Sequence, residues 1–287
     1  MNRWLMPATA EIFRALGALC ETPDPAHARL AAALGLPPPP DAAAFTEVFV
    51  FQLVPYAAPH LSSDGMLGGE AGDRVAGFWR ALQLSPPAEP DHLAALLGLC
   101  AALGERENTQ PGLAGPWREA RRALLWEHLL TWVPMYTDAM TTLPSPFHRA
   151  WAQLLRQALL AETQALAPPP AVPLHLRDVP PLPDPGSRDF PRALLAPVRS
   201  GLLITRNDLA NAATATGLAA RPGGRAFTLA ALLGQDRAAT FGWLRQHAAW
   251  WAGRHQASVP SLGRIAQHWL GRAQASLQAL EQIPQHA

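Results

Sequence analysis

The residues with the clearest chemical potential stand in one short run, Glu89-Pro90-Asp91-His92, directly before an apolar helical stripe. One interpretation is helix capping, in which Asp91 or Glu89 accepts hydrogen bonds from free N–H groups and His92 covers the first turn. The other is a small acidic pocket for a cationic partner group, such as a peptide arginine, which carboxylates can bind bidentately. Both interpretations remain open on the sequence, and neither needs catalytic machinery.

Aromatic residues accompany this acidic run. The chain has ten tryptophans, and Trp79, Trp126 and Trp132 fall in the same part of the sequence. Most of them are expected to be packing residues. An aromatic surface beside carboxylates would suit a peptide that is part apolar and part arginine. The combination indicates a binding module.

Sequence motifs of common enzyme classes are absent. The chain contains no GxSxG, GxxxxGK[ST] or GxGxxG, and it has no lysine, which a Walker-type phosphate loop requires. We therefore predict that the protein is not an enzyme. A helical metal- or nucleotide-dependent enzyme is the alternative in that class.

The histidines and cysteines do not form a metal-binding pattern. His128 is adjacent to Glu127, so the two side chains would point about 100° apart on a helix, and His128 is expected to be a core histidine. Cys20 and Cys100 are not part of any CxxC motif and are typical of small core hydrophobes in a reducing compartment. We predict no metal and no cofactor.

Composition excludes several further classes. The chain of 287 residues is 49% hydrophobic and 16% charged, which is sufficient for a sizeable core. The net charge is +1, and the arginines are scattered almost singly, so nucleic acid is not expected as a partner. The sequence shows neither a signal-peptide pattern nor a run of about 18 apolar residues. We expect a soluble, cytoplasmic protein without stable membrane insertion.

Apolar residues recur at helical spacing almost everywhere, and alternating strand patterns are scarce. The predicted fold class is therefore all-α, a helical bundle followed by a smaller helical module. Residues 55–72 contain two prolines and four glycines and are expected to form a long structured loop, which is often functional. Helices are predicted over 12–19, 30–34, 41–53, 73–82, 93–103, 116–129 and 146–159.

A proline-rich segment divides the chain. Ten of the residues from 167 to 197 are proline, which favours extended conformations and a linker or a strap. We predict a helical domain over 1–166, a connector over 167–199 and a C-terminal helical module over 200–287. A loose bundle with such long connections would also permit a homodimer.

Local signals predict the helices of the C-terminal module. Thr205 and Asp208 have the spacing of a capping box, and Asp236 can cap a further helix. Pro260 is expected to begin the last helix. The text TRNDLANAATATGL resembles the first half of a helix-turn-helix, so a DNA-binding or regulatory protein is an alternative function. The following PGGRAFTLAALL lacks the polar, arginine-rich face of a recognition helix.

Five segments in order resemble a known family. They are VFVFQLVPYAAPHLSSDGMLGGE, FWRALQL, EPDHLAALLGLCAAL, EHLLTWVP and PFHRAWAQLL, which together cover about residues 48–160. They resemble the TorD-like redox-enzyme maturation chaperones, which include the DmsD-type and NarJ-type proteins. The module 200–287 lies outside this resemblance.

The resemblance implies an all-α chaperone that binds the precursor of a molybdopterin-containing oxidoreductase, often at its twin-arginine signal peptide, until the cofactor is loaded. It also implies which residues contact the client. The expected arginine end is at Asp91 and nearby acids, and the expected apolar end is at Tyr56, Trp79 and the loop. The positions that match the family's recognition motifs are Tyr56, Trp79, Glu89, Pro90, Asp91 and His92, with His128 and Trp132 in a matching helix that could equally be structural.

Overall fold

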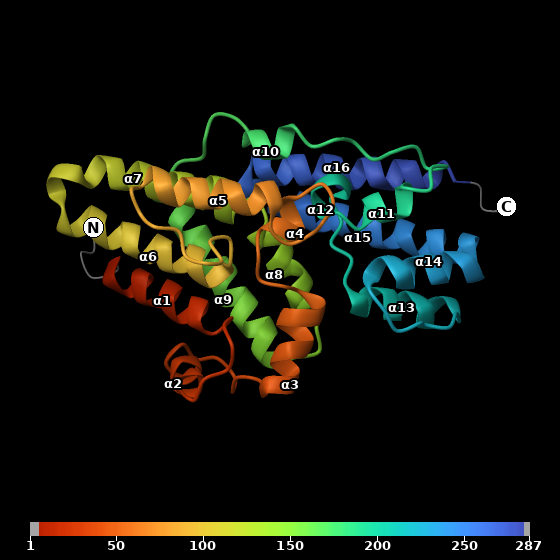
Figure 1. Ribbon diagram of the computed structural model, residues 1–287, viewed down its shortest axis with the longest axis horizontal. Helices are drawn as coiled ribbons and strands as arrows, with labels where there is room; N and C mark the ends of the chain where they lie inside the picture. Colours follow the sequence, from red (N-terminus) through yellow and green to blue (C-terminus); the bar gives the residue numbers. More distant parts are fainter. Residues whose placement is uncertain (1–5, 284–287) are drawn as a thin grey trace. The chain divides into compact units, whose positions relative to one another are not determined.

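The computed structural model describes residues 6–283 and divides the chain into two compact units. Unit 1 comprises residues 1–58 and 67–170, and unit 2 comprises residues 59–66 and 171–287. Every named element in the described range is a helix, and no strand is present there, so the all-α prediction is confirmed (Figure 1). Most of the predicted connector, residues 171–199, is part of unit 2, and so is the short excursion 59–66.

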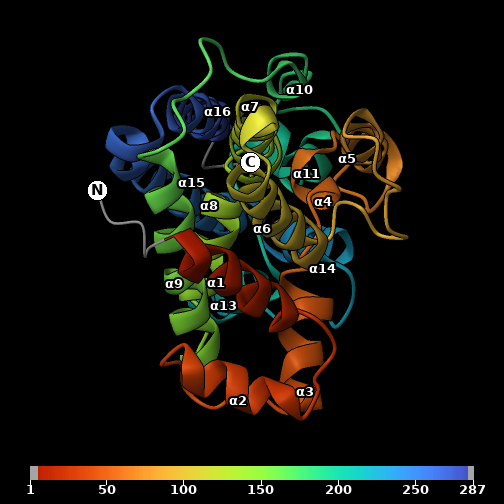
Figure 2. The same ribbon diagram turned by 90° about the vertical axis from the view of Figure 1, so that its left-hand side faces the viewer.

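Unit 1 is a bundle in which α6 is central, because α1, α7 and the π-helix η3 all pack against it. Figure 2 shows α1 lying across α6 and α9. The helices of unit 1 are α1 Met6–Ala18, α2 Ala26–Ala33, α3 Ala42–Phe45, the π-helix η1 Thr46–Gln52, α5 Gly69–Ala81, α6 Leu93–Thr109, the 3-10 helix η2 Pro111–Leu113, α7 Ala114–Ala123, the π-helix η3 Leu124–Leu129, α8 Val133–Thr141 and α9 Pro146–Thr163.

Large aromatic side chains fill the core of unit 1, and each of three buried tryptophans also satisfies a backbone carbonyl. Trp151 donates its indole N–H to Leu16 O at 3.0 Å and so ties α9 to α1. Trp126 donates to Leu166 O, and Trp132 donates to His128 O, both at 2.8 Å. A buried indole N–H without a partner would be costly, so these bonds fix the register of the bundle.

One buried ionic cluster joins three helices of unit 1. The Arg121 guanidinium on α7 lies 3.0 Å from Glu107 on α6 and 3.4 Å from Glu162 on α9. Burial raises the pKa of Glu162, and Arg121 opposes that shift. Cys100 and Cys20 are also buried, as the sequence predicts, and burial raises the pKa of both thiols.

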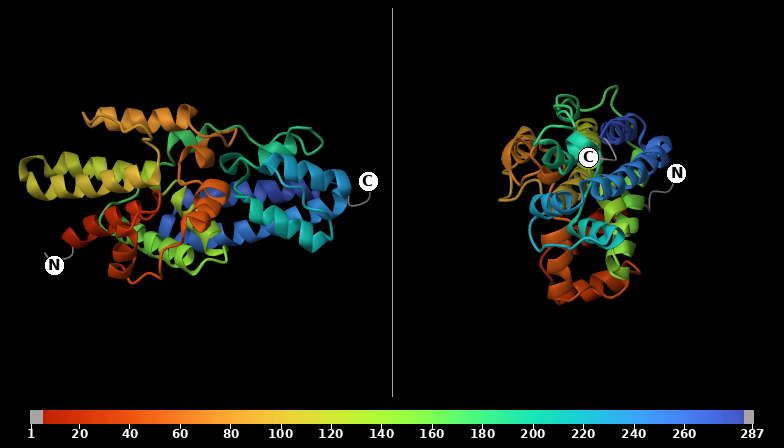
Figure 3. Two further views of the ribbon diagram at one scale, coloured as in Figure 1. Left: turned by 60° about the horizontal axis from the view of Figure 1, so that its bottom comes forward. Right: turned by 90° about the vertical axis from the view of Figure 1, so that its right-hand side faces the viewer.

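Unit 2 is built on the long antiparallel pair α15 and α16, which lie side by side in Figure 3. Gly201 permits a close approach of the chain to α16, because its φ is +71° and an added Cβ would lie 2.5 Å from Ala273 N. The helices of unit 2 are most of α4 Ala58–Leu61, then α10 Leu174–Arg177, α11 Phe190–Leu194, α12 Pro197–Ser200, α13 Arg206–Thr216, α14 Arg225–Gln235, α15 Arg237–Leu262 and α16 Arg264–Glu281.

The buried segment after Gly201 has no strand partner, so side chains satisfy its carbonyls. Trp251 donates to Leu203 O at 3.1 Å, and Arg225 donates to Ile204 O at 2.9 Å. Ring atom Nε2 of His255 lies 2.9 Å from Gly201 O. Trp251 and His255 of α15 are therefore structural.

The capping predictions for α13 and α15 hold, since Asp236 accepts from Ala239 N at 2.8 Å at the start of α15. Ser145 accepts from His148 N at the start of α9, and Thr205 with Asp208 forms a complete capping box on α13. The prediction that Pro260 begins the last helix is wrong. The helix α15 continues through Pro260, and the chain reverses at Gly263, whose φ of +52° a proline cannot adopt.

Two buried histidines make unit 1 sensitive to acid. Burial lowers the pKa of both His128 and His148 to about 4, and a nearby arginine, Arg74, also lowers that of His128. The folded state holds both rings neutral, whereas the unfolded chain protonates them below its ordinary pKa of 6.5. Stability is therefore lost as the pH falls from about 6.5 towards 4.

We predict that His148→Gln reduces this acid sensitivity. Between pH 7 and pH 5 the free energy of unfolding of the variant should fall by about 2 kcal/mol less than that of the unaltered protein. Urea unfolding at the two pH values measures the difference. Equal losses in the two proteins would contradict the burial argument.

Candidate functional site

The site begins with a short backbone pairing between two segments that are far apart in the sequence. Tyr56 and His92 form an isolated antiparallel bridge. Ala57 N donates to Asp91 O at 3.1 Å, and Leu93 N donates to Pro55 O at 2.8 Å. These bonds lay residues 55–58 along the start of α6 and so fix where the neighbouring side chains point.

His92 is the N-cap of α6. Its Nδ1 accepts from Ala94 N at 3.2 Å. The capping interpretation predicted that Asp91 or Glu89 would be the acceptor, and this prediction is wrong, because the imidazole of His92 takes that role. Burial lowers the pKa of His92, although Glu89, Glu21 and Asp91 oppose the shift. A neutral ring that accepts at Nδ1 carries its proton on Nε2, where it can still donate. The cap therefore adds no positive charge to the site.

Tyr56 covers the face of this cap. Its ring meets that of His92 edge-on, with the centroids 4.7 Å apart. Burial, a hydrogen bond to Glu89 and nearby carboxylates raise the pKa of Tyr56 to about 12. The phenol therefore stays protonated at neutral pH and helps to orient the Glu89 carboxylate.

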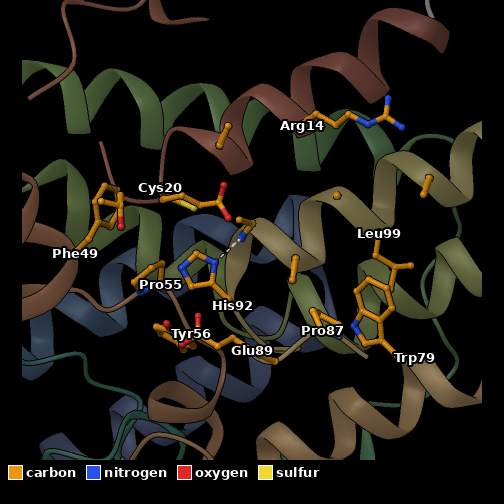
Figure 4. A pocket seen from close by; sticks show the side chains of 18 of the residues that line it. Arg14, Cys20, Phe49, Pro55, Tyr56, Trp79, Pro87, Glu89, His92 and Leu99 are labelled. Carbon is orange, nitrogen blue, oxygen red and sulfur yellow. Dashed lines mark hydrogen bonds between the residues drawn. The ribbon is translucent and has the colours of Figure 1, made fainter. Parts of the chain in front are cut away.

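A groove of about 990 Å³ opens over these residues (Figure 4). Its floor is the face of α6 that carries Ala95, Leu99 and Ala102. Its walls come from the end of α1, from η1, from Trp79 on α5 and from the segment 84–89. Figure 4 shows Phe49 and Trp79 on opposite sides of the central residues Tyr56, Glu89 and His92.

Two carboxylates at this groove are not neutralised by arginine. Glu89 and Glu21 are exposed, both line the groove, and both act on the pKa of His92. Within residues 10–283 no ion pair joins either of them to an arginine, whereas Glu105, Glu107, Glu119, Glu162 and Asp138 are all paired. The groove therefore presents negative charge inside apolar walls.

Asp91 has a different position from Glu89. It is only 5% exposed, and its Oδ2 accepts from Ala58 N at 2.9 Å. It also lines a second hollow of about 460 Å³, on the other side of Tyr56 and Glu89, together with Asp73 and the half-buried Pro90. The carboxylate of Asp91 thus anchors the 55–58 segment, and Glu89 is the acid that borders both hollows.

The remaining predicted site residues separate into two groups. Trp79 is half-buried and forms part of the groove wall. His128 and Trp132 are buried at 5% and 1% exposure, and neither lines the groove. His128 packs against Phe78, with ring centroids 4.7 Å apart, and Trp132 packs against Tyr136. Their environment is that of core residues.

Sequence reasoning missed Glu21 and the contribution of η1. Gly17 allows α1 to pack closely on α6, since an added Cβ would lie 3.3 Å from Ala94 Cα. That approach brings the segment after α1, with Glu21, to the start of α6. In η1, the π-helical bond from Leu53 N to Val48 O shifts the turn, and Val50 is 52% exposed at the rim. Neither feature has a local sequence signal.

Other site classes are not found in the described part of the chain. No group of three or more His, Cys, Asp or Glu residues among residues 6–283 is arranged to hold a metal ion. None of the described helices combines the length and the hydropathy that spanning a membrane would require. The exposed residues of α14 are Ala226, Phe227, Ala230, Gly234 and Gln235, a face with one polar side chain and no arginine, which does not favour the helix-turn-helix alternative.

Unit 1 thus combines an all-α bundle with a groove that has apolar walls and exposed carboxylates. The family model described as nitrate reductase delta subunit matches residues 24–138, which is less than half of the chain. The match confirms the resemblance predicted from the sequence, and this segment carries the pattern of a family of redox-enzyme maturation chaperones. It contains four of the five resembling segments, and PFHRAWAQLL lies beyond its end.

No curated protein and no solved structure matches the chain significantly.

We predict unequal stability effects for two neighbouring acids. Asp91→Ala should lower the free energy of unfolding by about 1–3 kcal/mol, because Ala58 N loses its buried acceptor. Glu89→Ala should change it by less than about 0.5 kcal/mol, because Glu89 is exposed. Urea unfolding of the two variants tests this, and an Asp91→Ala variant as stable as the unaltered protein would refute the anchoring role.

Proposed function

We propose that this protein is a system-specific maturation chaperone that binds the precursor of a molybdopterin-containing oxidoreductase. It acts in the cytoplasm and holds the precursor, at its twin-arginine signal peptide, while the cofactor is loaded before export. The protein acts by binding, and we assign no catalytic step to it. The chaperone family matched by residues 24–138 supports the general role.

One observation carries the proposal: the groove combines an apolar lining with two carboxylates that form no ion pair with an arginine of residues 10–283. A signal peptide combines arginines with an apolar run, so its receptor needs both features together. Glu89 and Glu21 supply the acceptors for guanidinium groups, and Trp79 and Leu99 belong to the apolar surface. Desolvation by the apolar walls strengthens such charge-assisted hydrogen bonds.

The distribution of charge between the two units also favours unit 1 as the part that binds a cationic peptide. Unit 1 contains 15 acidic residues and 11 arginines, whereas unit 2 contains seven acidic residues and 12 arginines. A cationic segment is therefore attracted to unit 1 and repelled by unit 2. The small net charge of the whole chain conceals this division.

The experiment has two stages. Affinity purification from the native host, with mass spectrometry of the co-eluting proteins, should recover the catalytic subunit of a molybdoenzyme. Its absence under all growth conditions would contradict the proposed function. The N-terminal segment of the recovered precursor is then the peptide for calorimetry with the purified chaperone.

We predict that Glu89→Gln and Glu21→Gln each weaken binding of this peptide by about threefold to tenfold at low salt. Glu127→Gln is the matched control, because Glu127 is also an exposed acid of unit 1 but lies outside the groove. It should bind as the unaltered protein does. Equal affinities for all four proteins would exclude the carboxylates from recognition.

A further inference from the structure

The groove is not acidic at one end and apolar at the other. Glu89 lies in the middle, since Figure 4 places Phe49 and Pro55 on one side of His92 and Glu89, and Trp79 and Leu99 on the other. Glu21 lines the same groove and lies close enough to His92 to act on its pKa. Each side is an apolar lobe. The first, which we name the η1 lobe, consists of Phe45, Phe49, Val50 and Pro55, and the second, the α6 lobe, consists of Trp79, Leu84, Pro87, Leu99 and Ala102.

Separate observations indicate that each lobe can receive an apolar side chain. In the η1 lobe, Phe45 and Phe49 are in contact, with ring centroids 5.0 Å apart, and the side chain of Val50 is exposed beside them. In the α6 lobe, Gly98 leaves open space, since an added Cβ would have no atom within 4 Å. From His92 to Ala102 the floor extends about 15 Å, enough for four or five residues of an extended peptide.

The far end of the α6 lobe is basic. Arg14 and Arg106 line it, where Arg14 pairs with Glu105 and Arg106 lies over the ring of Trp117 at 5.0 Å. Three charged groups at that end leave a net positive charge. A cationic client residue is therefore attracted to Glu21 and Glu89 and disfavoured at the Arg106 end.

We infer that the client segment carries apolar residues on both sides of its cationic residues. The cationic residues bind over Glu21 and Glu89, one apolar flank fills the η1 lobe, and the other fills the α6 lobe. A segment with its arginines at one end would leave one lobe exposed to water. This inference rests on the proposed function of the groove, and it specifies the pattern of sequence that the groove selects.

Synthetic peptides of equal composition test the inference without knowledge of the client. One peptide has two adjacent arginines between two runs of leucine and alanine, and a second has both arginines at its N-terminus. A third has them at its C-terminus. By calorimetry the centred peptide should bind at least about tenfold more tightly than either permuted peptide. Equal binding of all three would overturn the inference.

Double-mutant cycles between the protein and the centred peptide show which flank of the peptide binds in which lobe. Val50→Ala should couple to truncation of one flank of the centred peptide, and Trp79→Ala should couple to truncation of the other. Coupling of both variants to the same flank would also overturn the inference. Gly98→Leu should weaken binding of the flank that couples to Trp79, because the added side chain fills the α6 lobe.

Gly77→Leu is the matched control for Gly98→Leu. Gly77 is likewise a helical glycine with nothing within 4 Å of an added Cβ, but it does not line the groove. It should leave peptide binding unchanged. Failure of the proposed function would be distinct: no peptide and no precursor segment would bind at all, whereas failure of this inference alone would show as binding that ignores the position of the arginines.

Discussion

The backbone pairing of residues 55–58 with residues 91–93 is the constraint on which the site depends. Asp91 fixes it from the side chain by accepting from Ala58 N, and two backbone bonds fix it from the main chain. Because the pairing is in place, the ring of Tyr56 covers the His92 cap and its hydroxyl orients Glu89. The chain passes to unit 2 directly after Ala58, so this pairing also secures the end of the first segment of unit 1.

Electrostatics is the basis of the selectivity that we propose for the groove. The acidic residues of the core, such as Glu162 and Asp138, are paired with arginines, so their charges are used within the fold. Among the described residues no arginine forms an ion pair with Glu21 or Glu89 at the groove, and the neutral His92 near them does not cancel their charge. A cationic group can thus bind there without displacing an internal ion pair. The apolar lobes on both sides add hydrophobic contact area to that charge pairing.

Much of the fold could be predicted from the sequence, because its signals are local. Apolar residues at helical spacing predicted most helices, and Thr205 with Asp208 predicted a capping box that the structure contains. The start of the last helix was predicted at Pro260, but the chain reverses three residues later, at Gly263. Either residue type can mark a helix boundary, and only the backbone conformation shows which of the two does so here. The π-helices depend on which carbonyl an N–H selects, and no residue type dictates that choice.

The sequence indicated where the candidate site lies, but not which residue of the run forms the cap, which is buried and which is exposed. The run Glu89 to His92 indicated either a cap formed by Asp91 or Glu89 or an acidic pocket. In the structure His92 is the cap, and Glu89 lines the groove. The exposure of Glu89 and the burial of Asp91 follow from tertiary packing, so two acids of the same run differ in their contacts. Glu21 joins them through the packing of α1 on α6, which a linear motif cannot record.

The central claim is that the groove of unit 1 receives a cationic, apolar peptide segment of a redox-enzyme precursor. Hydrogen exchange with mass spectrometry, in the presence and absence of the precursor's N-terminal segment, tests it most directly. The account predicts slower exchange in residues 45–56, in 79–89 and in the first turns of α6, and little change in α15 and α16. Slower exchange confined to unit 2, or no change in these groove segments while the peptide is bound, would contradict it.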